Sequence, residues 1–68
     1  MKKGKVKFFD TKKGYGFIYP ENGGKDVYIH VSELERAGYR DLDVGDNICY
    51  ELKTNKKGKE QAVNIKII

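Results

Sequence analysis

The chain contains no tryptophan and only one cysteine, one histidine and one proline among its 68 residues. The single cysteine, Cys49, excludes an intrachain disulfide and a zinc site built from several cysteines. With so few histidines and cysteines, we find no nucleophilic triad, paired acid site or metal cluster, so the sequence argues against an enzyme and predicts no cofactor. A lone thiol without disulfides fits a reducing compartment, so we expect a cytoplasmic protein.

Long apolar runs are also missing. No segment approaches the roughly 20 apolar residues that a membrane-spanning helix needs, so we expect no membrane partner. The basic start, residues 1–5, leads into alternating rather than continuous apolar residues, which does not match a secretory signal. A chain of 68 residues has room for one small domain, and we expect that domain to span residues 1–68.

Acidic residues are outnumbered by basic ones, ten to fourteen, and the formal net charge is +4. The charges are segregated along the chain. Residues 1–13 carry six lysines and one aspartate, residues 14–52 carry three basic and eight acidic side chains, and residues 53–68 carry five lysines and one glutamate. Lysines often serve only solubility in a small domain. If both basic ends fold onto one side, however, they form a surface that attracts a polyanion.

Five runs rich in aromatic and β-branched residues are separated by turn-forming residues. Short strands at this spacing predict an all-β barrel or sandwich. In the longest connection, Ser32 followed three residues later by Glu35 matches a capping box, so we expect a short helical turn there, ended by Gly38. The expected strands are Lys5–Asp10, Tyr15–Pro20, Asp26–Val31, Asn47–Thr54 and Gln61–Ile68.

Strand alternation predicts which side chains form the core. We expect Leu34 and Leu42 at the mouth of the barrel, closing it. Strict alternation would place Phe8 inward beside Val6, so a bulge in the first strand is required to turn the Phe8 ring outward. The expected core on the strands is aliphatic: Val6, Ile18, Val27, Ile29, Ile48, Leu52, Val63, Ile65 and Ile67.

The same alternation leaves Tyr15, Phe17, Tyr28 and His30 facing outward on neighbouring strands. The reverse arrangement, with these rings inside, would expose aliphatic side chains beside charged neighbours, against usual burial preferences. A contiguous exposed aromatic patch marks a binding surface. Stacking of an unpaired base on such a ring contributes roughly 1–3 kcal/mol to binding. A duplex is a poor ligand because its bases are already stacked on one another. The sequence therefore predicts a single-stranded nucleic acid as partner, flanked by lysines at positions 7, 12, 13, 57 and 59.

Three polar or aromatic residues have more than one interpretation. His30 alone would be an ordinary surface or core histidine, but its register with Tyr28 favours stacking. Asp26 can accept hydrogen bonds from a base edge, or can hold Lys25 or a turn. Tyr39 can lean over the aromatic face or pack locally.

Three segments resemble those of a known family. Residues 13–18, Lys-Gly-Tyr-Gly-Phe-Ile, resemble the first ribonucleoprotein motif of the cold-shock domain, Lys-Gly-Phe-Gly-Phe-Ile. Residues 27–31, Val-Tyr-Ile-His-Val, resemble its second motif, Val-Phe-Val-His-Phe. Residues 4–10 are similar to the family's Gly-x-Val-Lys-Trp-Phe-Asn. The resemblance extends over residues 4–68 without large insertions, and the chain looks like a single-domain bacterial cold-shock protein.

This resemblance implies a five-stranded antiparallel OB-fold barrel that binds single-stranded RNA and DNA across its first three strands. It also implies a monomeric RNA chaperone that keeps transcripts unpaired when cold over-stabilises their secondary structure. The family's stacking positions carry over to Phe8, Tyr15, Phe17, Tyr28, His30 and Tyr39, and its polar and basic contacts to Lys7, Lys13, Asp26 and Lys57.

The chain departs from the family pattern at several contact positions. Phe8 replaces a tryptophan, and Val31 replaces an aromatic residue that offers a stacking platform. Asp10 replaces an asparagine and repels phosphate. The last loop has Lys59 after its glycine, where proline is frequent. We infer weaker stacking than in a typical relative, partly offset by the lysines.

Two other binding functions fit parts of the pattern. An OB domain associated with the ribosome or with translation initiation would bind structured RNA tightly and a free pyrimidine oligonucleotide weakly. An SH3-like barrel would grip a peptide with its aromatic residues, but its binding would depend little on salt and would leave the lysine-rich ends unexplained.

Overall fold

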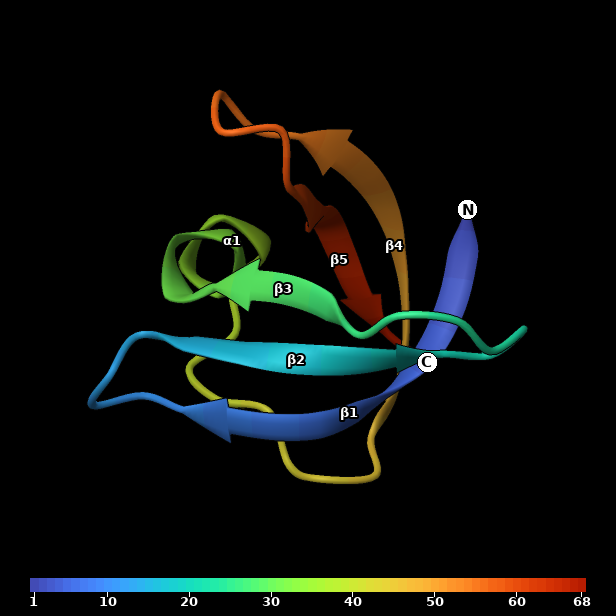
Figure 1. The fold of residues 1–68 in the computed structure, drawn as a ribbon. Helices are drawn as coiled ribbons and strands as arrows, with labels where there is room; N and C mark the ends of the chain where they lie inside the picture. The colour runs from blue at the N-terminus through green and yellow to red at the C-terminus, as the bar shows by residue number, and fades with distance from the viewer.

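Five strands and one short helix make up the structure, a computed structural model of residues 1–68 (Figure 1). In chain order they are β1 (Lys2–Asp10), β2 (Tyr15–Pro20), β3 (Val27–His30), α1 (Val31–Ala37), β4 (Asn47–Thr54) and β5 (Glu60–Ile67). The strands close into a barrel in the order β1–β2–β3–β5–β4. Four of the strand pairings are antiparallel, and a parallel pairing between Tyr28 and Gln61 joins β3 to β5. The predicted five-stranded OB-fold barrel is thus confirmed, with a parallel closing pair.

The first strand is longer than the sequence predicted. Residues 2–5 pair with β4, from Lys2 opposite Tyr50 to Lys5 opposite Asn47, and Gly4 also lies opposite Pro20 on β2. Lysine-rich segments carry little β-propensity of their own, so only the neighbouring strands reveal this extension. At the other end of the sheet, β3 stops at His30 because Val31 already begins the helix.

The helix begins two residues earlier than the predicted capping box. The N-cap is His30, whose side chain accepts a hydrogen bond from the Ser32 backbone N–H at 3.1 Å. Ser32 therefore lies inside α1, and the predicted role of Ser32 as the cap is wrong. The predicted end is confirmed, because Gly38 adopts the left-handed conformation with φ of 88° and its N–H donates to the Glu35 carbonyl. No helix in the structure is long and apolar enough to span a bilayer.

The core follows the predicted pattern except on β5. Leu34 and Leu42 are buried as expected, and Tyr50 joins them. Ala62 is buried in place of Val63, because Asn64 has a φ of 50° and interrupts the alternation, so that Ala62 and Ile65 both point inward. Of the other predicted members, Leu52 and Ile67 pack against the core while partly exposed. The buried members are Val6, Ile18, Val27, Ile29, Ile48 and Ile65.

A bulge in β1 turns Phe8 outward, as the alternation required. The pairing with β2 shifts between Val6 and Phe8, after which Phe8 lies opposite Phe17. Phe8 is 39% exposed, whereas Phe9 packs against the core. The bulge is possible because Gly16 has no side chain: a Cβ there would collide with the Phe8 carbonyl oxygen.

Candidate nucleic-acid interface

Five rings from three adjacent strands lie together on one side of the barrel, and we call this surface the aromatic face. Tyr15 lies at its centre and stacks on Tyr28, with ring centroids 6.0 Å apart and an interplanar angle of 23°. Edge-to-face contacts join Tyr15 to Phe8 at 6.1 Å and to Phe17 at 6.0 Å. His30 meets Tyr28 at 6.4 Å. These contacts hold the rings in place while leaving Phe8 and His30 exposed and the other three rings half-buried.

The register of the sheet produces this cluster. Tyr15 lies opposite His30 and Phe17 opposite Tyr28, so outward side chains of β2 and β3 meet across the strands. Diagonal neighbours in an antiparallel pair are within reach of aromatic side chains, which explains the stack of Tyr15 on Tyr28. The aliphatic partners Ile18, Val27 and Ile29 are buried on the opposite side of the same strands. The rings therefore form a preformed surface.

His30 has two roles that the sequence pattern did not reveal together. Its Nδ1 accepts from the Ser32 backbone N–H, and Ser32 Oγ lies 2.9 Å from the same nitrogen. Because Nδ1 acts as an acceptor, the neutral ring carries its proton on Nε2. The N-cap bond thus fixes the orientation of a ring that belongs to the aromatic face.

Lys7 and Asp26 form the one ion pair of the structure, with Nζ 2.9 Å from Oδ2. The sequence left Lys25 or a turn as possible partners of Asp26, and the structure gives Lys7 instead. Both side chains remain accessible, at 57% and 33% exposure. The ion pair lies beside the rings, because Lys7 precedes Phe8 and Asp26 directly precedes β3.

The turn after β1 is held by Asp10. Its Oδ1 accepts from the backbone N–H groups of Lys12 at 2.8 Å and Lys13 at 3.2 Å. The carboxylate at this position therefore orders the turn that carries two exposed lysines.

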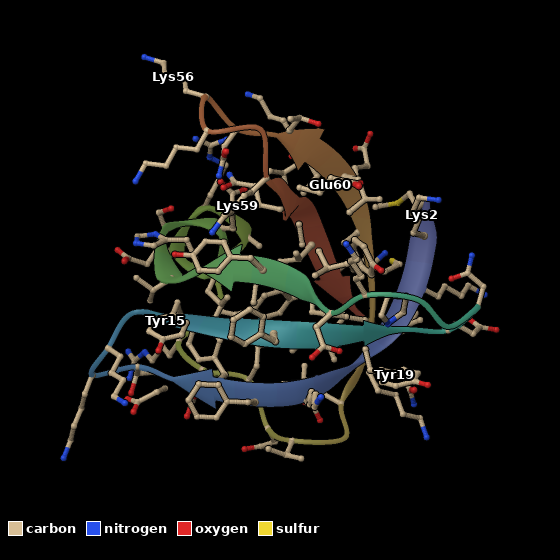
Figure 2. All side chains as sticks on the ribbon, viewed as in Figure 1. Lys2, Tyr15, Tyr19, Lys56, Lys59 and Glu60 are labelled. Carbon is tan, nitrogen blue, oxygen red and sulfur yellow. The ribbon has the colours of Figure 1, made fainter.

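The loop between β4 and β5 brings the second group of lysines to the aromatic face. Lys57 lines a hollow of about 690 Å³ together with Phe17, Tyr28 and His30. Figure 2 shows Lys56 at the tip of this loop and Lys59 on its side toward β3. Sequence reasoning missed the other lining residues, which are Ser32, Asn55, Lys56 and Gln61.

Asn55 determines the shape of this loop. Its Oδ1 accepts from the N–H groups of Lys57 at 2.9 Å and Lys59 at 3.0 Å. The Asn55 backbone also exchanges bonds with Gly58 and Lys59. An asparagine directly before a lysine pair and a glycine was the available sequence signal, since its side chain commonly closes such turns.

Tyr39 is the one predicted stacking residue that the structure does not bring to this face. It follows α1, packs partly buried against the core, and its hydroxyl accepts from the Ile67 N–H at 3.1 Å. None of the ring contacts includes Tyr39. Local packing, the alternative interpretation of this residue, describes its position.

A closed OB-type barrel that exposes clustered rings between two groups of lysines defines a class of nucleic-acid-binding domain. Comparison with known proteins gives the family. Residues 2–68 match the model of the 'Cold-shock' DNA-binding domain. The chain belongs to this cold-shock domain family, a nucleic-acid-binding family rather than an enzyme family.

Relatives match over nearly their whole length. The chain is 50% identical over 66 residues to the probable cold shock protein y4cH of Sinorhizobium fredii, covering 96% of each chain. It is 46% identical over 66 residues to a cold shock-like protein of Thermotoga maritima, covering 97% of each. The fold is also shared with a solved structure, Drosophila Unr CSD456, at a TM-score of 0.77 and 20% identity. That match covers 98% of this chain, which spans 26% of the Unr chain.

Proposed function

We propose that this chain binds single-stranded RNA and DNA across the aromatic face and acts as an RNA chaperone that keeps transcripts unpaired. The observation that carries the proposal is the cluster of five rings on β1, β2 and β3, all of them at least partly accessible to solvent. Each ring offers a flat surface to an unpaired base, and stacking of this kind tolerates any base. The chain acts in this proposal as one cytoplasmic domain and as a monomer.

The chaperone activity requires no chemical step. A protein that binds only the open form of a hairpin shifts the opening equilibrium by mass action, so binding energy alone melts the stem. Each base held by a ring contributes roughly 1–3 kcal/mol, comparable with the roughly 1.4 kcal/mol of an average DNA base-pair step. Each occupied ring therefore offsets the loss of about one base-pair step.

Substitutions on the aromatic face test the binding site. Phe17→Ala and Tyr28→Ala should each weaken binding of a short labelled oligouridylate by roughly 1–3 kcal/mol, measured by fluorescence anisotropy. Val44→Ala is the matched surface control, since Val44 is exposed and lies outside the aromatic face. Unchanged affinity in both ring variants, with the fold intact by circular dichroism, would show that the binding face lies elsewhere.

A titration with matched ligands tests the choice of partner. We expect tight binding to a single-stranded oligonucleotide, weak binding to its duplex, and an increased open fraction of a hairpin labelled with fluorophore and quencher. Emission of the five tyrosines can report binding because the chain has no tryptophan. Tight binding to the closed hairpin with weak binding to the free oligonucleotide would favour the ribosome-associated alternative instead.

A further inference from the structure

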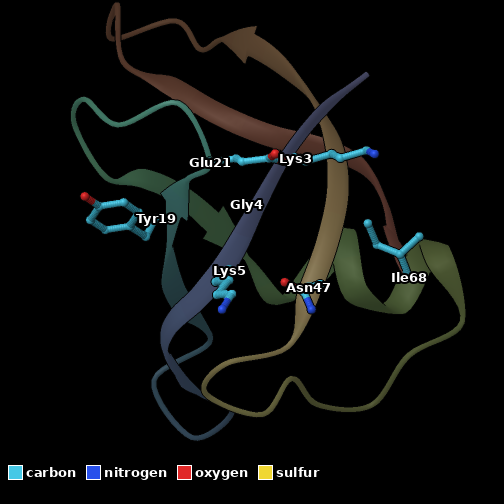
Figure 3. A pocket seen from close by; sticks show the side chains of 7 residues that line it. All are labelled: Lys3, Gly4, Lys5, Tyr19, Glu21, Asn47 and Ile68. Carbon is cyan, nitrogen blue, oxygen red and sulfur yellow. The ribbon is translucent and has the colours of Figure 1, made fainter.

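A second hollow lies along the outer side of β1 and shares no residue with the aromatic face. Its volume is about 600 Å³, within the range of small-ligand pockets. Figure 3 shows Tyr19 on one side of β1 and Asn47 on the other, with Lys5 between them. The register agrees, because Lys5 lies opposite Tyr19 on β2 and opposite Asn47 on β4.

The side chains of this pocket repeat the chemistry of the aromatic face on a smaller scale. Tyr19 is 52% exposed, a large fraction for a ring, and belongs to none of the ring contacts that hold the aromatic face together. Lys3 and Lys5 supply two positive charges against one acidic side chain, that of Glu21. These groups fit one nucleotide: the ring can stack on a base, the two ammonium groups can bind a phosphate, and the Asn47 amide can bond to a base edge.

Exposed lysines on β1 lead from the pocket toward the aromatic face. Lys3 and Lys5 are two residues apart and leave the strand on the same side, roughly 6.6 Å apart. The next lysine, Lys7, lies in the bulge and is exposed as well. Lys7 marks the edge of the aromatic face through its ion pair with Asp26. Tyr15 and Tyr19 lie near opposite ends of β2 (Figure 2), which places the two sites at separate points of one path.

We propose that the pocket of Lys3, Lys5, Tyr19 and Asn47 binds a further nucleotide of the single strand that occupies the aromatic face. The base stacks on Tyr19, and the phosphate backbone reaches the pocket along the lysines of β1. This inference rests on the proposed function and extends it, because it predicts a longer footprint than the five clustered rings provide.

Oligonucleotide length separates the two sites. We would measure anisotropy with labelled oligouridylates of about six and about sixteen nucleotides, one near the lower end and one at the upper end of the site sizes of OB domains. Tyr19→Thr keeps a residue that favours strands and removes the ring. It should weaken binding of the long oligonucleotide roughly five- to tenfold and leave the short one within about twofold.

Lysine substitutions provide an independent test with a matched control. Lys3→Gln combined with Lys5→Gln should weaken binding of the long oligonucleotide more than Lys53→Gln combined with Lys66→Gln. The control pair removes the same charge from exposed lysines of β4 and β5 that do not line the pocket. Equal losses would mean that only the net charge matters, and would overturn the assignment.

Tyr28→Ala distinguishes failure of this inference from failure of the proposed function. If Tyr28→Ala weakens both oligonucleotides while Tyr19→Thr leaves both unchanged, the aromatic face binds nucleic acid and the pocket does not. If Tyr19→Thr weakens the short and long ligands equally, the pocket is not a separate site for a strand extension. If Tyr28→Ala affects neither ligand, the proposed function itself is wrong.

Discussion

A Cβ atom at Gly16 would lie 2.8 Å from Phe9 Cα and would collide with the Phe8 carbonyl oxygen. Both neighbours are backbone atoms of the bulged segment, so they cannot move without changing the pairing of β1 with β2. This glycine therefore permits both the close pairing of β1 with β2 and the outward position of the Phe8 ring.

Gly16→Ala should destabilise the fold by roughly 1–3 kcal/mol or more, because the alanine Cβ cannot be accommodated unless the backbone shifts. Urea unfolding followed by circular dichroism measures this change. Gly23→Asn is a useful control: Gly23 has a φ of 81° and open space around its Cβ position, and asparagine tolerates that conformation. An unchanged unfolding midpoint in Gly16→Ala would contradict the close approach of β1 and β2.

At the scale of elements, His30 connects the helix to the aromatic face. Its Nδ1 caps α1 while its ring contacts Tyr28. Two substitutions separate these roles. His30→Phe keeps an aromatic ring and removes the acceptor for the Ser32 N–H, whereas His30→Asn keeps an N-cap acceptor and removes the ring.

We expect His30→Phe to lose about 1 kcal/mol of folding stability, the typical effect of a lost cap, with little change in oligonucleotide affinity. His30→Asn should show the reverse: nearly unchanged stability and affinity lowered by roughly 1–3 kcal/mol. Thermal unfolding and anisotropy titrations provide the two measurements. If both variants lose stability and keep affinity, or both lose affinity and keep stability, His30 does not have these two roles.

The strands and the helix also show how much of the fold and of the site can be predicted from the sequence. Alternation alone predicted that Tyr15, Phe17 and Tyr28 face outward, because the direction of a strand side chain depends only on its position in that strand. The same alternation showed that Phe8 needs a bulge to face outward. The position of Tyr39 was not predictable, because it depends on a hydrogen bond to Ile67, which is 28 residues away. The inward positions of β5 were not predictable either. Asn64 has a positive φ, and as a result Ala62 is buried instead of Val63.

At the scale of the whole molecule, the buried Tyr50 couples folding to pH. Tyr50 is 1% exposed, and burial raises the pKa of its phenol above the ordinary value of 10.0. The folded state therefore holds this proton more tightly than the unfolded chain. The stability from burying the neutral phenol is fully present below pH 10.0 and is lost as pH rises through the higher folded-state pKa.

Tyr50→Phe removes the ionisable group while keeping the ring inside the barrel. We expect the free energy of unfolding to fall less steeply with pH in this variant than in the unchanged protein, above about pH 10. Urea unfolding at about pH 8 and about pH 11 measures the difference. Parallel losses in the two proteins would show that Tyr50 does not carry the pH dependence.

The distribution of charge over the molecule makes a last prediction about salt. Affinity for a single strand should fall as salt rises, and each phosphate that the protein neutralises should add roughly 0.7 to the steepness of that fall on logarithmic axes. Lys57 has no carboxylate partner, so Lys57→Gln should reduce the slope by about that amount.

Lys7 is already neutralised by Asp26, so Asp26→Asn should free the Lys7 ammonium for phosphate. The variant should then show a steeper salt dependence and a higher affinity at low salt. If Asp26 instead accepts hydrogen bonds from a base edge, Asp26→Asn lowers affinity by a similar factor at every salt concentration, because such a bond releases no counterions. Anisotropy titrations over a range of potassium chloride concentrations therefore decide which role Asp26 has in binding.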